Sequence, residues 1–106
     1  MQYIAERILL FSEKKCSIRK EVRIRIGVPY PVQQDKVEFS VDRYTSGCRV
    51  EIEGIDECGF DLYGMDSLQA VNLASNIEPL IERLSGDYDF FWLSGEPYFD
   101  EEDEVD

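Results

Sequence analysis

The chain has 106 residues, of which 43% are hydrophobic, and a formal net charge of −12. This length and hydrophobic content are typical of one folded domain, and the negative charge argues against binding to nucleic acid or to an anionic membrane. The charge is uneven, because residues 1–30 hold seven Lys/Arg and three Asp/Glu while residues 31–106 hold four and twenty, which gives +4 and −16.

The first third of the chain predicts two strands. Residues 3–12 carry apolar side chains on both faces, as in a well-covered strand, and we expect Leu9 and Phe11 to point outward. Residues 19–28 alternate between apolar and charged side chains, which predicts a half-buried strand that ends before Pro29. The expected inward residues are Val22, Ile24, Ile26 and Val28, and the expected outward ones are Arg19, Glu21, Arg23 and Arg25.

Three shorter strands are expected next, over residues 36–43, 48–53 and 58–63. A hairpin turn at 45–47 and a second turn at 54–57 separate them, and such short turns favour an antiparallel meander. We expect buried thiols at Cys48 and Cys58. We also expect Arg19, Arg23 and Arg25 to form ion pairs across strands with Glu38, Glu51 or Glu53.

From Leu68 onward, apolar residues recur at helical spacing, at positions 68, 71, 74, 77, 81 and 84. Asp66 and Gln69 have the form of a capping box, and Pro79 predicts a kink or break near residues 76–78. A short aromatic strand over residues 88–93 and an acidic run follow. The sequence therefore predicts an α+β fold, in which an antiparallel meander of five to six strands has one kinked helix, about residues 66–85, packed on one face. Residues 1–99 are expected to form a single domain and residues 100–106 a frayed acidic tail.

The chain lacks histidine, which removes the usual general base and the commonest metal ligand. We therefore expect a protein without catalytic residues, metal or cofactor, although carboxylate-only catalysis, as in glycosidases, stays an alternative. The three cysteines are odd in number and form no C-x-x-C pair, and the first residues lack the pattern of a signal peptide. These features predict a cytoplasmic protein with reduced thiols.

Residues 64–68, Gly-Met-Asp-Ser-Leu, match the Gly-x-Asp-Ser-Leu signature of acyl and peptidyl carrier proteins. In that family the serine takes phosphopantetheine and opens the second helix of a four-helix bundle. Here Ser67 follows about sixty residues with a strand period, so the Asp-Ser pair is better explained as a helix cap.

Three segments together resemble a family of small, uncharacterised bacterial domains. They are Ile4-Ala5-Glu6-Arg7, the stretch Tyr-Gly-Met-Asp-Ser-Leu-Gln-Ala at residues 63–70, and the aromatic strand that ends in Trp92. The resemblance covers most of the chain, leaves out residues 100–106, and implies the fold described above but no catalytic residues. In size, charge and lack of catalytic groups, the chain is also loosely similar to bacterial immunity proteins, including those of contact-dependent growth inhibition, which neutralise a toxin domain that is often a basic nuclease.

We therefore expect a non-catalytic, acidic protein-binding domain, foremost an immunity-type inhibitor of a basic toxin or nuclease, without direct contact to nucleic acid or membrane. One alternative is a structural or accessory domain that forms a homodimer, motivated by Leu9 and Phe11. Another is a nucleic-acid mimic whose carboxylates stand in for phosphates. The candidate partner-binding residues are Asp56, Glu57, Asp61, Glu96, Tyr98, Phe99, Asp100 and Glu101.

Overall fold

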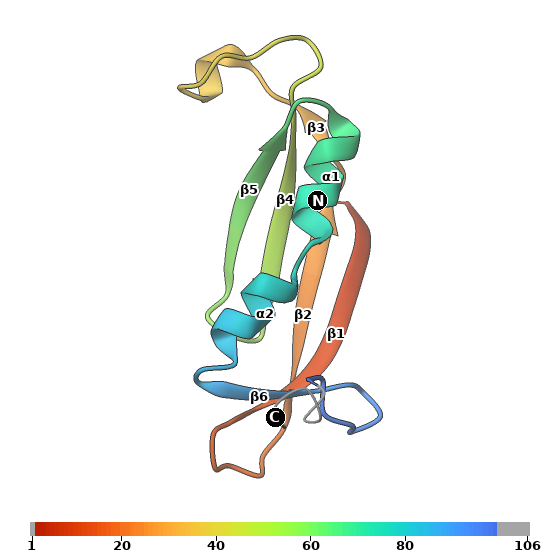
Figure 1. Cartoon of the computed structure of the whole chain (residues 1–106), viewed down its shortest axis with the longest axis vertical. Coiled ribbons are helices and arrows are strands. Elements are labelled where there is room, and N and C mark those ends of the chain that lie inside the picture. Colours follow the sequence, from red (N-terminus) through yellow and green to blue (C-terminus); the bar gives the residue numbers. More distant parts are fainter. Residues whose placement is uncertain (1, 100–106) are drawn as a thin grey trace, which may run out of the picture.

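Six strands form one open antiparallel sheet in the computed structural model, which describes residues 2–99. Two hairpins, β1–β2 and β4–β5, are joined through the pairing of β2 with β4, while β3 adds to β4 and β6 adds to the end of β1 (Figure 1). The elements in chain order are β1 (Tyr3–Glu13), β2 (Lys20–Gly27), β3 (Tyr30–Pro31), a 3₁₀ helix (Gln34–Lys36), β4 (Ser46–Glu53), β5 (Cys58–Gly64), α1 (Ser67–Ser75), α2 (Glu78–Leu84) and β6 (Tyr88–Phe91).

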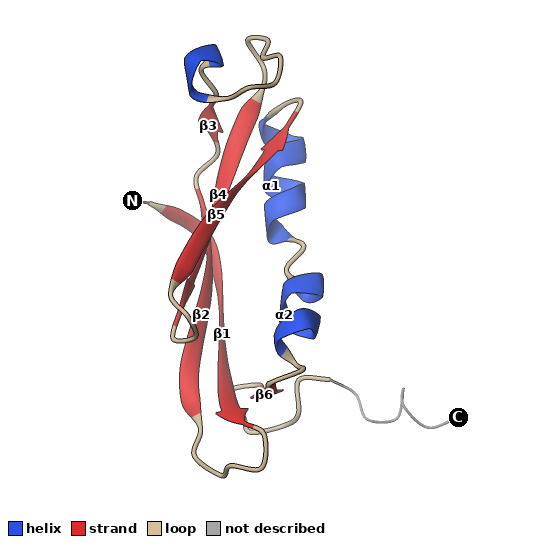
Figure 2. Cartoon of the chain, turned by 90° about the vertical axis from the view of Figure 1, so that its left-hand side faces the viewer, coloured by secondary structure: helices blue, strands red, loops and turns tan. Residues whose placement is uncertain are grey.

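The two helices lie end to end on one face of the sheet, and none of the described segments covers the other face (Figure 2). The predicted fold class is confirmed, since this is an α+β arrangement of a six-stranded antiparallel sheet and one bent helical segment. The predicted tail, residues 100–106, lies outside the described residues.

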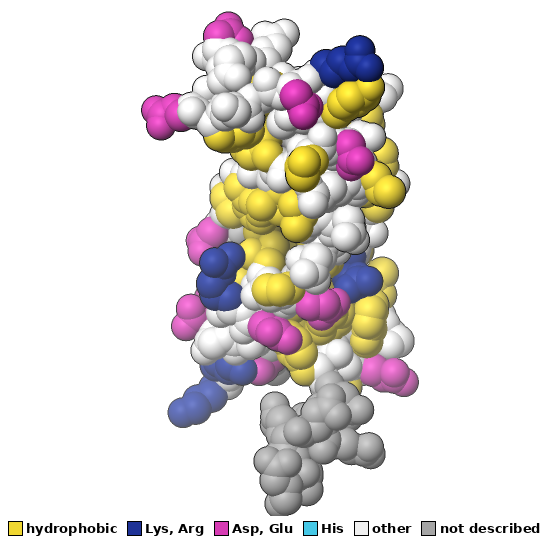
Figure 3. All heavy atoms as spheres, turned by 45° about the horizontal axis from the view of Figure 1, so that its top comes forward, with side chains coloured by type: hydrophobic (Ala, Val, Ile, Leu, Met, Phe, Trp, Pro, Cys, Tyr) yellow, Lys and Arg dark blue, Asp and Glu magenta, His cyan; other side chains and the backbone are white. Residues whose placement is uncertain are grey.

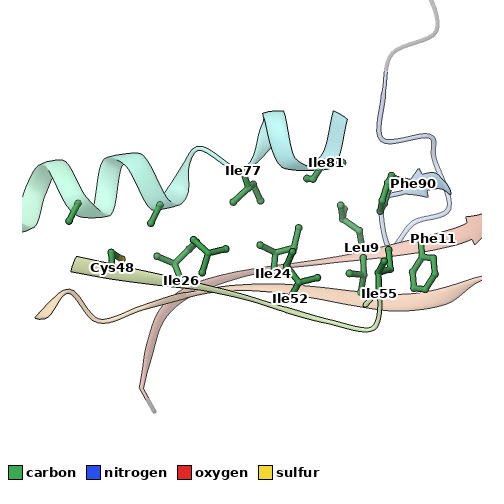
Figure 4. Close-up of a cluster of buried hydrophobic side chains, with 14 residues drawn as sticks. Leu9, Phe11, Ile24, Ile26, Cys48, Ile52, Ile55, Ile77, Ile81 and Phe90 are labelled. Atoms are coloured by element: carbon green, nitrogen blue, oxygen red, sulfur yellow. The ribbon is translucent and has the colours of Figure 1, made fainter. Parts of the chain in front are cut away.

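The hydrophobic core fills the space between the helices and the sheet (Figure 4). Alternate residues of the central strands point toward the helices, as the period of two requires. The expectation that Leu9 and Phe11 point outward is wrong, because they are 0% and 6% exposed. Phe11 also packs edge-on against Tyr88, with ring centroids 5.5 Å apart. The buried core residues are Leu9, Phe11, Val22, Ile24, Ile26, Cys48, Val50, Ile52, Ile55, Ala70, Ala74, Ile77, Ile81 and Phe90.

The helical segment breaks where Pro79 predicts it. α1 ends at Ser75, α2 begins at Glu78, and Pro79 occupies the first turn of α2, where its missing N–H costs no hydrogen bond. At the start of α1, the Asp66 carboxylate accepts a hydrogen bond from the backbone N–H of Gln69 at 2.8 Å. The Gln69 side chain in turn accepts one from the N–H of Met65 at 2.6 Å, so the predicted capping box is present with its return bond one residue earlier.

The buried stripe of the helices differs from the predicted spacing at its beginning. Ala70 and Ala74 face the sheet, whereas Leu68 is 77% exposed. Small side chains at the two buried positions allow α1 to lie close to β4 and β5. Ser67 opens α1 as its first residue, with Asp66 rather than Ser67 as the N-cap.

The predicted strand over residues 36–43 is wrong. The segment contains the end of the 3₁₀ helix and a loop, and Phe39 is exposed. The side chain of Gln34 donates to the carbonyl of Phe39 at 2.8 Å and accepts from the N–H of Val41 at 2.9 Å. The Asp42 carboxylate accepts from the N–H groups of Tyr44 and Thr45. Side chains thus satisfy backbone groups that a neighbouring strand would otherwise pair.

Four smaller expectations also need correction. Val28 is exposed, because β2 ends at Gly27. Residues 46 and 47 belong to β4 and not to a turn. Cys58 is exposed, because β5 is the outermost strand on its side, whereas Cys48 is buried as expected and its pKa is raised by burial. The aromatic strand is shorter than predicted, because β6 ends at Phe91 and residues 92 and 93 lie beyond it.

Candidate protein-binding surface

The uncovered face of the sheet carries charged side chains from four strands. The pairing register places Glu6 opposite Arg25, and Arg25 opposite Glu51. It also places Arg49 opposite Asp61. Because the core residues of these strands occupy the alternate positions, all these charged residues point away from the helices. We call this surface the outer face.

Two arginines organise the outer face, and each is shared by two carboxylates. Arg25 lies 3.2 Å from Glu6 and 3.0 Å from Glu53, measured between nitrogen and oxygen. Arg49 lies 3.2 Å from Glu51 and 3.0 Å from Asp61. Each group of three therefore keeps one uncompensated negative charge. Exposed pairs of this kind add only about 0–1 kcal/mol each to stability, so the arrangement contributes more to surface charge than to folding.

Two tyrosines fix the carboxylates in place. The hydroxyl of Tyr3 donates to Glu51 at 2.7 Å, and that of Tyr30 donates to Asp61 at 2.8 Å. The bond from Tyr3, followed by that from Arg49, holds the pKa of Glu51 below its usual value. Burial, and then the bond to Asp61, raises the pKa of Tyr30. The outer face therefore holds oriented carboxylates next to half-exposed aromatic rings.

Two glycines let long side chains lie flat on the outer face. A Cβ at Gly47 would collide with the ring of Tyr30, and one at Gly59 would collide with the guanidinium of Arg49. Both side chains reach Asp61 by crossing these glycines. The surface between β4 and β5 is consequently low and accessible. A depression of about 530 Å³ lies there, lined by Arg25, Arg49, Glu51, Ile52, Glu53, Glu57, Cys58 and Gly59.

The structure does not bring all the predicted partner-binding residues together. Asp61 points to the outer face, and Asp56 and Glu57 form the turn between β4 and β5. Glu57 also lines the outer-face depression. The other predicted residues are elsewhere: Glu96, Tyr98 and Phe99 follow β6, while Asp100 and Glu101 lie outside the described residues.

Tyr98 and Phe99 pack against the core on the helix side. Arg7 donates to Glu78 at 2.9 Å and to the hydroxyl oxygen of Tyr98 at 2.7 Å, and the Tyr98 hydroxyl donates to Glu78. The rings of Trp92 and Tyr98 are 4.8 Å apart, with the Arg7 guanidinium within 6 Å of both. These contacts tie β1, α2 and the chain after β6 together, which gives Tyr98 a role inside the domain.

The partly buried side chain of Tyr98 predicts a loss of stability at high pH. Burial, and then the hydrogen bond to Glu78, raises the pKa of Tyr98 to about 12 from an ordinary 10.0. The folded state therefore holds this proton more tightly, so its contribution to stability is complete below pH 10 and is lost as pH rises toward 12. We expect Tyr98→Phe to make the decline in the free energy of unfolding between pH 9 and pH 12 shallower, measured by urea titration. The exposed Tyr44→Phe is the control, and equal declines in both variants would contradict the prediction.

Several residues of the outer face were not singled out from the sequence. Of the arginines expected to pair across strands, Arg25 does so with Glu53, whereas Arg23 pairs with Glu21 on its own strand. Arg19 instead lies over the ring of Phe91 and donates to the carbonyl of Gly95. The residues missed are Tyr3, Tyr30 and Arg49. The alternation of these residues with apolar ones was visible in the sequence, but the strand register that brings Tyr3 to Glu51, and Tyr30 and Arg49 to Asp61, was not.

Within residues 2–99, the structure contains no group of three or more potential metal ligands. No helix in this part of the chain is long and apolar enough to cross a membrane. Comparison with protein-family models, curated proteins and solved structures finds no match to this chain.

Proposed function

We propose that the protein is a non-catalytic, acidic protein-binding domain of the immunity type, which blocks a basic toxin or nuclease in the cytoplasm and uses the outer face to do so. The observation that carries this proposal is the pair of shared arginines, each flanked by two carboxylates on an uncovered sheet face. A basic side chain from a partner would complete each group of three to charge neutrality. Such complementarity speeds association and selects the partner.

The aromatic residues of the outer face add to this argument. Tyr3, Tyr30 and Tyr63 are each more than a third exposed. Tyrosine is enriched where protein interfaces concentrate their binding energy, because it offers a large rigid ring with a polar end. The hydroxyls of Tyr3 and Tyr30 hold carboxylates in place, so part of the entropic cost of ordering the charges is met before a partner arrives.

The two alternative functions gain less support. The homodimer hypothesis was motivated by Leu9 and Phe11, which are buried. The nucleic-acid mimic needs carboxylates spaced along one face without cations between them, but Arg25 and Arg49 lie among them on the outer face. The carrier-protein signature at residues 64–68 gains no support either, because the described residues form an antiparallel sheet with two short helices and not a four-helix bundle.

The proposal is tested by binding to the product of the gene immediately upstream. We expect that product to be basic and to bind with an affinity that falls steeply with salt. The double variant Glu51→Gln, Glu53→Gln should weaken binding by about tenfold or more. The matched control is the double variant Glu82→Gln, Asp87→Asn, which removes the same amount of charge from α2 and from the turn between α2 and β6. It should change binding far less.

The readouts are titration calorimetry at two salt concentrations and growth of cells that express the upstream product. The outer-face variant should lose both binding and protection, while its urea unfolding stays close to that of the wild type. If the upstream product is not basic and does not bind, or if the two double variants weaken binding equally, the proposal fails.

A further inference from the structure

Strand β5 has one edge without a partner. It pairs with β4 in an unbroken register from Ser46 opposite Gly64 to Ile52 opposite Cys58. Among residues 2–99, no other strand pairs with its second edge, which faces the viewer in Figure 2. Alternate residues of an antiparallel edge strand point their N–H and C=O groups away from the sheet. An extended segment of another chain can pair with such groups.

Apart from the charge of Asp61, this edge lacks the features that normally prevent strand addition. Edge strands are usually protected by lysine, proline, a bulge or a covering segment. β5 contains no lysine or proline and no register shift. The other long edge, along β1, differs because β6 pairs with its residues Leu10 to Glu13. The rest of β1 has a register shift against β2 between Tyr3 and Ala5, and its Arg7 is held by Glu78 and Tyr98. The protein thus protects one edge and leaves the other open.

The two sides of the β5 edge differ in chemistry. Phe60 and Leu62 lie opposite Val50 and Cys48 and therefore face the helix side, where Phe60 is 37% exposed. Figure 3 views this side and shows exposed hydrophobic side chains gathered over its middle. Asp61 points to the outer face, where it shares Arg49 with Glu51. An added strand would therefore meet apolar surface on one side and net negative charge on the other.

We infer that β5 binds an extended segment of a basic partner as an added strand, in which apolar residues facing Phe60 and Leu62 alternate with Lys or Arg facing Asp61. This inference deepens the proposed function, and it rests on that function for the identity of the partner as a basic protein. A second copy of the chain fits the edge less well, because two chains of charge −12 repel each other.

The outer-face depression gives the inference a specific contact. It begins at Cys58 and Gly59 on β5 and is bordered by Glu53 and Glu57. Glu57 makes no ion pair with any described residue, whereas Glu53 shares Arg25 with Glu6. A basic side chain from the end of the added strand would enter this depression and pair with Glu57.

The test uses two eight-residue peptides that contain four valines and four arginines. In one peptide the two residue types alternate, and in the other they form two blocks. We expect the alternating peptide to slow amide hydrogen exchange in β5 by about tenfold or more, since added hydrogen bonds protect the edge amides. The block peptide, which has the same charge, should slow it far less. Amides of β1 and β2 in the same experiment report that the domain stays folded.

Two matched variants locate the contact. Phe60→Lys places a lysine on the edge strand and should abolish the protection, whereas Leu68→Lys adds the same charge on α1 and should preserve it. Tyr63→Lys provides a second edge variant if Phe60→Lys unfolds the domain. Equal protection by both peptides, or survival of the effect in both edge variants, overturns the inference.

Two further outcomes separate this inference from the proposed function. If the upstream product binds with the expected salt dependence but leaves β5 amides unprotected, strand addition is wrong and the outer-face function stands. If the alternating peptide protects β5 but the upstream product does not bind, the proposed function is wrong and the open edge stands. Protection of β5 that rises with protein concentration, without peptide, overturns the inference in favour of a second copy.

Discussion

Replacing Leu9 by alanine is expected to lower the free energy of unfolding by about 2–5 kcal/mol. Leu9 is 0% exposed and belongs to the core between the sheet and the helices. Removing its branched end both loses buried apolar area and leaves a cavity, because the neighbouring side chains on strands cannot collapse fully into it. Urea titration monitored by the fluorescence of Trp92 measures the change.

The control for Leu9→Ala is Leu68→Ala, the same substitution at a side chain that is 77% exposed. It should change stability by no more than about 0.5 kcal/mol, as surface substitutions usually do. A comparable loss in both variants would contradict the assignment of Leu9 to the core. The loss at Leu9 should also be independent of protein concentration, whereas a dimer contact at Leu9 would make it concentration-dependent.

Replacing Gly54 by alanine is expected to cost about 2 kcal/mol or more. Gly54 turns the chain after β4 with φ at +112°, a conformation that costs residues with a side chain roughly 1–3 kcal/mol. In addition, a Cβ at Gly54 would collide with the backbone carbonyl oxygen of Glu21 on β2. Since that oxygen belongs to the backbone of β2 beside the end of its pairing with β4, the turn must move, and this pairing is disturbed.

Two other glycines separate the causes of this loss. Gly95 has φ at +96° but an added Cβ would come no nearer than 3.5 Å to the Arg19 side chain, so Gly95→Ala isolates the backbone strain. Gly86 has no positive φ, and an added Cβ would make only an ordinary contact of 3.6 Å with the carbonyl oxygen of Arg83, so Gly86→Ala should be nearly neutral. We expect the losses to fall in the order Gly54, Gly95, Gly86 in thermal unfolding. A loss at Gly86 equal to that at Gly54 would refute the explanation.

The elements that sequence predicted well are those in which local pattern and tertiary contacts agree. Val22, Ile24 and Ile26 alternate with charges in β2, and all three are buried. Asp66 and Pro79 fix the start and the break of the helical segment through local backbone chemistry that needs no distant partner. Such signals are readable because the residues themselves determine the conformation.

The sequence predictions were wrong where the local pattern fitted two arrangements and a contact with residues distant in the sequence decided between them. β1 is apolar on both faces, so the sequence alone could not tell that Leu9 faces the helices. The alternation at residues 36–43 would suit a strand, but Gln34 and Asp42 bind the backbone instead. Likewise, the meeting of Tyr30, Arg49 and Asp61 depends on the β4–β5 register, which no local signal gives.

The break between the helices bears on how a partner can be accommodated. α1 has nine residues and α2 seven, both below the roughly 12–15 residues at which an isolated helix becomes marginally stable in water. Each helix therefore persists only while it rests on the sheet. A ligand that displaced the two helices from the sheet would also have to unfold them, whereas a ligand that binds the outer face or the β5 edge leaves the helices in place. The shortness of the two helices thus makes the sheet the rigid part of the molecule. Its free face and edge are the surfaces where binding requires the least structural rearrangement.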